Sequence, residues 1–287
     1  MKIGIVGLGL IGGSLAKAIK LQASHRVYGC DLSEAVQLRA RMVEAIDGRL
    51  TAHQLRQCDL VLVALYPDEA VSYLQSHAAS FKPGAVVCDC CGIKTRICRI
   101  GFALAREHGF TFVGGHPMAG IERFGFAAAR AGLFNRATMI LVPEPETGLE
   151  VLEGLKAFFL SIGFGRIKIT TAEEHDRVIA YTSQLAHVLS SAYIKSPAAR
   201  DHAGISAGSF RDMTRVATLQ PRMWSQLCLE NRAALLPELS GLIERLGAYR
   251  DALADNDFAA LAELFEEGCR YKDEVDKLTP NGARQGG

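Results

Sequence analysis

The amino-terminal stretch constrains the fold of this chain most strongly. Lys2–Val6 is a short apolar run typical of a strand buried in a parallel sheet, and it leads directly into the glycine-rich segment Gly7–Gly12. Apolar residues at helical spacing follow at once, among them Leu15 and Ile19. A strand, a glycine-rich turn and a helix in this order predict the first unit of a dinucleotide-binding sheet.

The glycines of this segment are expected to have separate tasks. Gly7 permits the tight turn, Gly9 lets the backbone approach a pyrophosphate, and Gly12 allows the helix to pack closely on the strand. Free N–H groups at the start of the helix complete an anion site. The segment predicted to bind the cofactor comprises Gly7, Leu8, Gly9, Leu10, Ile11 and Gly12. The alternative is a structural turn without a ligand.

A second strand, Arg26–Cys30, ends at Asp31, about 20 residues beyond the glycines, where dinucleotide-binding folds place an acidic residue. A carboxylate there accepts hydrogen bonds from the ribose hydroxyls and repels a 2′-phosphate. The sequence therefore favours NAD over NADP as the cofactor.

Strand and helix patterns alternate up to residue 169, which predicts the α/β class with a doubly wound, Rossmann-like sheet. Further strands are expected at Cys58–Leu65, Ala85–Asp89, Phe110–Val113, Ala137–Val142 and Gly165–Ile169, and helices at Ser33–Ala45, Asp68–Ala78, Lys94–His108 and Leu149–Ile162. Ligands bind at the carboxyl ends of the strands in such sheets. Leu65, Tyr66, Pro67 and Lys94 are therefore expected to contribute to the cofactor site.

From Thr171 onward the pattern is helical, and Thr171–Glu174 has the form of a capping box. We expect a dinucleotide-binding domain over residues 1–169 and an all-helical substrate and dimerisation domain over residues 170–287. The helical part carries more apolar surface than one small unit needs, which predicts a homodimer through it. The residues in question are Leu227, Leu229, Leu235, Leu236, Leu239, Leu242, Ile243 and Leu246.

Composition excludes several classes of function. The net charge is +1, which gives no electrostatic reason to expect nucleic acid or a membrane surface as partner. No stretch approaches the roughly 18 apolar residues of a membrane span. The chain starts at a core strand, so no cleavable leader is expected, and the eight cysteines are interpreted as free thiols rather than a metal site. A soluble, cytoplasmic protein is expected.

His116 is the first residue outside the glycine-rich segment that indicates chemistry. It stands between glycines and a proline, shortly after an expected strand end, on the rim where the nicotinamide of a dinucleotide would lie. The flanking glycines are expected to leave it without packed neighbours. An imidazole that titrates near neutrality can take a proton from a substrate hydroxyl as hydride leaves. We interpret His116 as a catalytic base, the alternative being a structural histidine that caps the loop.

Arg211 and Arg215 lie four residues apart on an expected helix, so they share a face, and Trp224 follows. An arginine is a natural partner for a substrate carboxylate. Taken alone, the pair is better explained as a solvated helix face that is paired through Asp212.

Three motifs in order identify a family. Gly-Leu-Gly-Leu-Ile-Gly-Gly near the start, Gly115–Gly120 and Phe210–Arg215, with His175, Asp176 and His187 between the last two, resemble the prephenate and arogenate dehydrogenases of tyrosine biosynthesis over essentially the whole chain. The resemblance implies a cyclohexadienyl substrate with a hydroxyl at C4 and a carboxylate at C1. It also implies hydride transfer from C4 to NAD(P), loss of the carboxylate as CO₂, and an aromatic product.

The resemblance also implies roles for single residues. His116 corresponds to the catalytic histidine, and Arg215 to the arginine that binds the carboxylate, with Arg211 as its neighbour. His187 corresponds to a second histidine of the substrate pocket. Glu122 corresponds to an acidic group that pairs with the arginine in the empty site.

Trp224 is expected at the edge of the substrate pocket or at the dimer interface. His175 and Asp176 are interpreted as structural residues at a helix start. Gly92 departs from the family pattern, because many members have a serine there that supports the catalytic histidine and the substrate hydroxyl. A water molecule or a backbone N–H is then expected to take over that hydrogen bond.

The choice between prephenate and arogenate stays open, because the two differ only in a ketone or an amine on the side chain. A β-hydroxyacid dehydrogenase is a less favoured alternative. Such enzymes use a lysine of the helical half, and Lys195, the one lysine between Arg177 and Arg270, lies outside the motifs. The third hypothesis is a non-catalytic NAD-binding regulator.

Overall fold

The computed structural model describes residues 1–202 and 204–278. The chain forms two compact units, one from Met1 to Leu235 and one that begins at Leu236. The division predicted near Thr170 lies inside the first unit. It marks the change from the sheet, which ends at Ile169, to the helices, which start at Ala172, and as a domain boundary it stays a prediction.

The centre of the first unit is an eight-stranded sheet with the order β3-β2-β1-β4-β5-β6-β7-β8. All neighbouring pairs are parallel except β6 and β7. The strand order reverses between β1 and β4, the position at which such folds bind a dinucleotide, so the predicted Rossmann-like sheet is confirmed. The strands are β1 Lys2–Val6, β2 Arg26–Cys30, β3 Gly48–Arg49, β4 Leu60–Val63, β5 Val86–Asp89, β6 Thr111–Pro117, β7 Thr138–Pro143 and β8 Arg166–Ile169.

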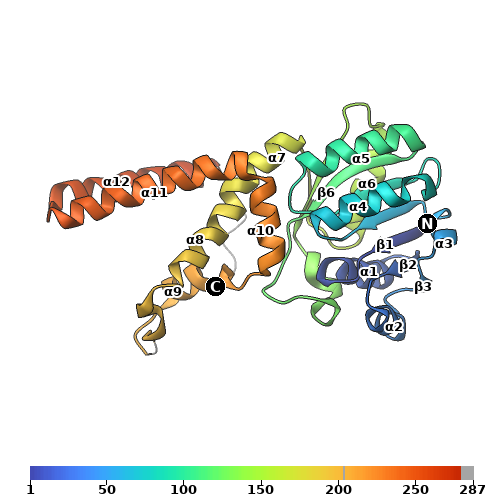
Figure 1. Cartoon of the computed structure of the whole chain (residues 1–287), viewed down its shortest axis with the longest axis horizontal. Helices are drawn as coiled ribbons and strands as arrows, with labels where there is room; N and C mark the ends of the chain where they lie inside the picture. Colours follow the sequence, from blue (N-terminus) through green and yellow to red (C-terminus); the bar gives the residue numbers. More distant parts are fainter. Residues whose placement is uncertain (203, 279–287) are drawn as a thin grey trace. The chain divides into compact units, whose positions relative to one another are not determined.

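Helices cover both faces of the sheet (Figure 1). One apolar core joins α1 (Leu10–Gln22), α2 (Glu34–Met42) and α6 (Leu149–Ser161) to one face. The other core joins α3, α4 and α5 to the opposite face. These helices are α3 Ala52–Leu55, α4 Pro67–His77 and α5 Thr95–His108. The 3₁₀ turn η1 (Ala78–Ser80) packs in the core of α3, α4 and α5. The turns η2 (Phe126–Ala128) and η3 (Ala131–Phe134) pack in the core of α1, α2 and α6.

Two local differences from the sequence prediction have physical reasons. The helix expected at Ser33–Ala45 starts with Ser33 as its N-cap, as predicted, but ends at Met42, and Glu44 has a positive φ of 54° that no helix accommodates. The strand expected to end at Val113 continues to Pro117, because β7 pairs with it in antiparallel register through His116 and Ile140. The short elements β3 and α3 lack the length to show a periodicity.

A long helix with an internal irregularity follows the sheet. It consists of α7 (Ala172–Ile179), a π-helical segment η4 (Ala180–Leu185) and α8 (Ala186–Tyr193). The Thr171 side chain accepts a hydrogen bond from Glu174 N, which confirms the predicted N-cap. The remaining elements of this unit are η5 Pro197–Arg200, α9 Gly208–Thr214, η6 Arg215–Ala217 and α10 Pro221–Glu230.

The second unit contains the larger part of α11 (Arg232–Ala254) and α12 (Phe258–Leu278). Tyr249 links the two helices, since its hydroxyl donates to Leu264 O at 3.0 Å. Large apolar side chains of this unit are exposed, among them Leu236, Ile243, Leu246 and Phe265. Of the leucines proposed for a dimer surface, Leu227 and Leu235 are instead buried within the first unit.

In the described parts of the chain, the helices are too short or too polar for any of them to traverse a lipid bilayer.

Candidate active site

The glycine-rich turn has the close contacts expected of a dinucleotide site. Gly7 has a φ of +85°, and a Cβ on Gly12 would lie 1.8 Å from Gly7 O, so neither position accepts a side chain. At Gly9, by contrast, no described atom from outside the adjoining chain lies within 4 Å of the position of a Cβ. The turn is therefore packed on the protein side and open where a pyrophosphate would approach.

Asp31 is fixed beside this turn. Its Oδ2 accepts from Leu8 N at 2.9 Å, and its Oδ1 accepts from Ser33 N at 2.9 Å. Each carboxylate oxygen keeps a further lone pair for a ribose hydroxyl. Gly9 is the N-cap of α1, and among the described residues no side chain caps it, so the N–H groups of the first turn remain available for an anion. The residues present fit a bound dinucleotide.

Leu65, Tyr66 and Pro67 lie on the same rim, since they connect β4 to α4 and Pro67 is the first residue of that helix. A Cβ on Gly7 would lie 2.8 Å from Leu65 Cδ2, which puts Leu65 against the turn. The environment of Lys94 is at odds with the cofactor-binding role expected for it. Its side chain is completely buried and pairs with Asp89, so it supports the rim from below.

His116 lies within β6 and not in a loop after it. The expectation that flanking glycines deprive it of packed neighbours is wrong, because these glycines are packed tightly. A Cβ on Gly115 would lie 2.3 Å from Asp89 O, and one on Gly114 would lie 2.4 Å from Cys98 Sγ. The glycines let β6 approach β5 and α5 closely, and this packing fixes His116 at the rim.

A buried hydrogen-bonded chain holds the His116 ring. His175 Nδ1 lies 2.7 Å from Asp176 Oδ1, and His175 Nε2 lies 2.9 Å from His116 Nδ1. A carboxylate only accepts, so the Nδ1 proton of neutral His175 points to Asp176 and its Nε2 accepts from His116 Nδ1. His116 then carries its proton on Nδ1, and its Nε2 is an unprotonated acceptor.

Asp176 anchors this chain through several donors. Its carboxylate accepts from Lys94 N at 2.7 Å, from Thr95 N at 2.8 Å and from the Thr95 hydroxyl at 2.6 Å. Burial would raise the pKa of Asp176, but the hydrogen bonds from His175, Thr95 and Lys94 outweigh it and the pKa is lowered. The group is therefore an anion. Asn231 extends the network by donating to Asp176 O at 2.8 Å.

Both histidines are held neutral. Burial lowers the pKa of His116 well below its ordinary value, and the neighbouring His175 and Lys94 lower it further. Burial also lowers the pKa of His175, against the opposing effect of Asp176. A neutral imidazole with a free Nε2 is the form that a general base requires.

The surroundings of His116 Nε2 are open on the side of Gly92. A Cβ on Gly92 would lie 3.9 Å from Nε2 and 3.4 Å from Leu227 Cδ2, both ordinary contact distances. The absence of a side chain at Gly92 thus leaves space next to the acceptor nitrogen. Leu227 of α10 forms the apolar wall of this space.

Arg215 and Glu122 form the ion pair expected from the sequence, with Arg215 Nη1 2.9 Å from Glu122 Oε1. His187 donates from Nδ1 to Ser183 O at 2.8 Å and stacks on Trp224, with ring centroids 3.9 Å apart. Burial lowers the pKa of His187, and the charge of Arg215 lowers it further.

These groups connect to His116 through α10. Trp224 and Leu227 lie three residues apart on this helix and therefore share a face. Leu227 borders the space at His116 Nε2, and the Trp224 ring stacks on His187. Arg211 is exposed on α9, one helical turn before Arg215.

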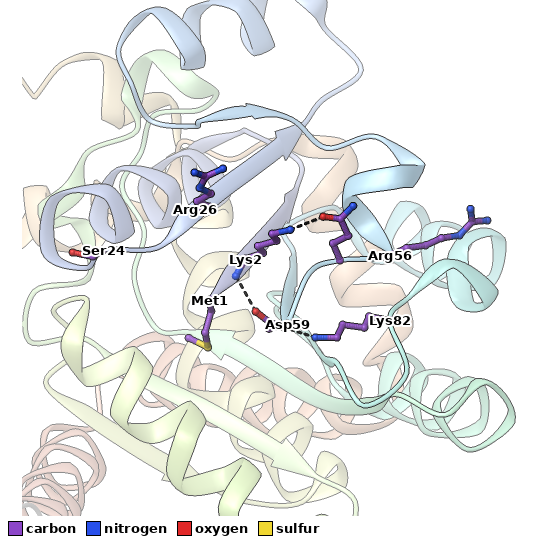
Figure 2. A pocket seen from close by; sticks show the side chains of 8 residues that line it. Met1, Lys2, Ser24, Arg26, Arg56, Asp59 and Lys82 are labelled. Carbon is purple, nitrogen blue, oxygen red and sulfur yellow. Dashed lines mark hydrogen bonds and ion pairs between the residues drawn. The ribbon is translucent and has the colours of Figure 1, made fainter.

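A hollow at the amino ends of the strands is separate from this site, which lies at their carboxyl ends. Figure 2 shows it at the amino ends of β1, β2 and β4, where Asp59 accepts from Lys2 N and pairs with Lys82. The residues that line it are Met1, Lys2, Ser24, Arg26, Arg56, Gln57, Asp59 and Lys82. Its position excludes contact with His116, which lies at the carboxyl end of β6.

Sequence reasoning missed the contact of His175 with His116, and with it the part that Asp176 and Asn231 play in holding the ring. The adjacent pair His175-Asp176 in the first turn of a helix was the available signal. A histidine followed directly by an acidic residue is too common to indicate a shared hydrogen bond without a fold.

Two family models match the chain. "Prephenate dehydrogenase, nucleotide-binding domain" matches residues 15–168, and "Prephenate dehydrogenase, dimerization domain" matches residues 171–267.

Individual relatives match over nearly the whole chain. The cyclohexadienyl dehydrogenase of Zymomonas mobilis is 37% identical over 284 residues, and the match covers 94% of each chain. The prephenate dehydrogenase of Lactococcus lactis is 30% identical over 284 residues, with 96% of this chain and 77% of the relative covered.

Solved structures share the architecture. The arogenate dehydrogenase of Synechocystis has a TM-score of 0.78 at 26% identity, with 96% of this chain and 100% of that chain covered. The prephenate dehydrogenase of A. aeolicus, in complex with hydroxyphenyl propionate and NAD+, has a TM-score of 0.83 at 24% identity, with 96% and 98% covered. The 3-hydroxyisobutyrate dehydrogenase of Mycobacterium tuberculosis, at 16% identity and a TM-score of 0.54, shares the fold alone, with 93% and 94% covered.

Proposed function

Because this chain belongs to the prephenate dehydrogenase family of enzymes, we propose that it oxidises prephenate to 4-hydroxyphenylpyruvate with NAD in tyrosine biosynthesis. Hydride leaves ring C4, the C1 carboxylate leaves as CO₂, and the ring becomes aromatic. Aromatisation supplies the driving force, so the protein has to orient the ring and handle one proton.

The observation that carries this proposal is the pair of hydrogen bonds that links Asp176 to His175 and His175 to His116. It leaves His116 Nε2 as the acceptor at the carboxyl rim of the sheet, beside the space at Gly92. The hydroxyl proton of the substrate moves to Nε2 as hydride leaves C4, and it returns to the ring oxygen when the carboxylate departs. No net proton is consumed.

Gly7–Gly12 and Asp31 support NAD as the cofactor. When bound, NAD supplies the hydride acceptor. The open backbone at Gly9 and the start of α1 hold the pyrophosphate, and the Asp31 carboxylate binds the ribose hydroxyls and repels a 2′-phosphate. Leu65, Tyr66 and Pro67 border the same site.

Arg215 binds the ring carboxylate in this proposal. Its pairing with Glu122 keeps the guanidinium in place in the empty site, and the substrate carboxylate takes the place of Glu122. His187 and Trp224 form an aromatic wall, since they stack on one another. Arg211 is a secondary cation at the entrance.

The homodimer belongs to the same proposal. The exposed apolar residues of α11 and α12 support a second copy of this chain as the partner, because a two-helix unit cannot bury them itself.

Arogenate is the second candidate substrate. It shares the ring, the C4 hydroxyl and the C1 carboxylate, and the named similarity to an arogenate dehydrogenase supports keeping it. A β-hydroxyacid dehydrogenase is disfavoured, because the likeness to such enzymes is one of fold.

The test is an assay of prephenate and arogenate, each with NAD and with NADP. We expect NADH formation at 340 nm together with CO₂ release, highest with prephenate and NAD. A higher kcat/KM with arogenate would reassign the substrate, and a higher kcat/KM with NADP would remove the role of Asp31 in cofactor choice. No turnover of either acid would reject the function.

A further inference from the structure

Asp89 and Lys94 form a buried ion pair directly below His116. Both side chains are completely buried, and Lys94 Nζ contacts Asp89 Oδ2. Lys94 Nζ also donates to Gly115 O at 2.6 Å, and Asp89 Oδ1 accepts from Gly115 N at 3.0 Å. The two side chains therefore hold both polar backbone groups of the residue that precedes His116.

The position of this pair explains why the sheet needs it. The pairing between β5 and β6 ends at Cys88 and Val113, two residues before Gly115. Along a strand, successive residues direct their N–H and C=O groups to opposite edges. Gly115 directs its groups toward the side of β5, where the backbone ladder has already ended. The side chains of Asp89 and Lys94 supply the hydrogen-bond partners that the backbone of β5 no longer provides to Gly115.

His116 is fixed on its other sides by different elements. It pairs with Ile140 of β7, and the next bond of that ladder runs from Met118 N to Thr138 O at 2.9 Å. Its ring is held by His175. Only the side toward β5 depends on a pair of charged side chains.

We propose that Asp89 and Lys94, which we call the Gly115 clamp, are positioning residues that set the orientation of His116 toward the substrate. The inference rests on the proposed function for its kinetic readout. Asp89 also accepts from Cys91 N at 2.8 Å, so the clamp ties the segment that carries Gly92 to β6 as well. It thereby holds the segment of Gly92 and the strand of His116, which both border the space at His116 Nε2.

The clamp also acts through charge. Asp89 and Lys94 bind the backbone of Gly115 next to His116. His175 and Asp176 of α7 lie on the ring side, and α10 contributes the uncharged Leu227. The Lys94 cation lowers the pKa of His116, after burial and His175. Loss of this cation moves that pKa upward, so the acidic limb of kcat/KM shifts to higher pH.

The experiment compares Asp89→Asn and Lys94→Met with a matched control, Lys82→Met. Lys82 pairs with Asp59 at 2.7 Å, and both side chains are solvent-exposed. This pair lies at the amino ends of the strands, away from His116 (Figure 2). All proteins are measured for NAD affinity by calorimetry, for kcat and KM over a pH series, and for the histidine ¹⁵N resonances that report ring tautomer and titration.

For both clamp variants we expect a kcat lowered on the order of 10²-fold, as for a misplaced catalytic group, with NAD affinity and substrate KM nearly unchanged. In Lys94→Met the His116 titration and the acidic limb move to higher pH. Lys82→Met behaves as the wild-type protein. A merely structural role would lower stability without moving the His116 resonances.

The proposal is overturned if both clamp variants keep kcat within about twofold of wild type and the His116 resonances stay in place. If Lys94→Met does not yield folded protein, Asp89→Asn decides, because it preserves the shape of the side chain. If the wild-type protein turns over neither cyclohexadienyl acid, the proposed function fails separately, and the His116 resonances alone decide on the clamp.

Discussion

His175 Nε2 lies 2.9 Å from His116 Nδ1, which joins a strand of the sheet to the first turn of a helix 59 residues later in the chain. The bond selects one tautomer of His116, because Asp176 holds the proton of His175 on the other ring nitrogen. His116 Nε2 is therefore a hydrogen-bond acceptor before any substrate binds.

Replacement of His175 tests this coupling. In His175→Phe, His116 loses the acceptor for its Nδ1 proton, so both tautomers become accessible and the ring is free to turn. We expect kcat to fall on the order of 10²-fold, with substrate KM little changed. Steady-state kinetics with circular dichroism as a folding control checks this. A kcat close to wild type would show that the tautomer is fixed in another way.

Stability is expected to decrease as pH falls below about 6.5. Burial lowers the pKa of His116, His175 and His187 from the ordinary value of 6.5, so the unfolded chain binds more protons than the folded chain once pH drops below that value. The lowered pKa of Asp176 extends the loss at still lower pH. Thermal unfolding between pH 8 and pH 5 measures this. The Tm should fall with acidification, and less steeply in His116→Asn; a Tm that rises contradicts the assignment of neutral buried histidines.

Arg215→Gln is expected to raise substrate KM while leaving stability nearly unchanged. The Arg215–Glu122 pair is exposed, with Arg215 65% and Glu122 39% accessible, and exposed pairs contribute at most about 1 kcal/mol. Arg222→Gln is the matched control, because Arg222 forms a similarly exposed pair with Glu69. Equal KM values for the two variants would remove Arg215 from carboxylate binding.

The proposed association of two chains is expected to depend on the exposed apolar surface of α11. Ile243 and Leu246 are exposed and share a face three residues apart, so Ile243→Glu and Leu246→Glu are expected to give monomers by analytical ultracentrifugation at micromolar concentration. Leu38→Glu is the control, because Leu38 is as exposed as Ile243 but lies on α2. A monomeric wild-type protein, or variants that remain dimeric, would contradict the proposed surface.

The sequence predicted the sheet well, because its strands are buried runs separated by amphipathic helices, and Gly7–Gly12 with Asp31 marks where it begins. It also predicted the ion pair of Arg215 and Glu122, through the family resemblance. What it could not predict depends on distances between remote residues. Lys94 looked like a rim residue because it follows a strand end, but its buried partner Asp89 turns it inward.

His116 illustrates the same limit. Flanking glycines suggested an open loop, but they are small because β5 and α5 lie against them, as the position of a Cβ on Gly115 shows. The hydrogen bond to His175 requires β6 and α7 to be adjacent, which no local pattern encodes. Local patterns thus identified the catalytic candidate, and only the fold revealed what orients it.

The measurement that tests the central claim most directly is the turnover of His116→Asn with prephenate and NAD. Asparagine keeps a polar group near Nδ1 but removes the acceptor at Nε2, so we expect NAD affinity to be retained and kcat to fall by on the order of 10²-fold or more. A turnover near that of the wild-type enzyme would contradict the role of His116 as the base.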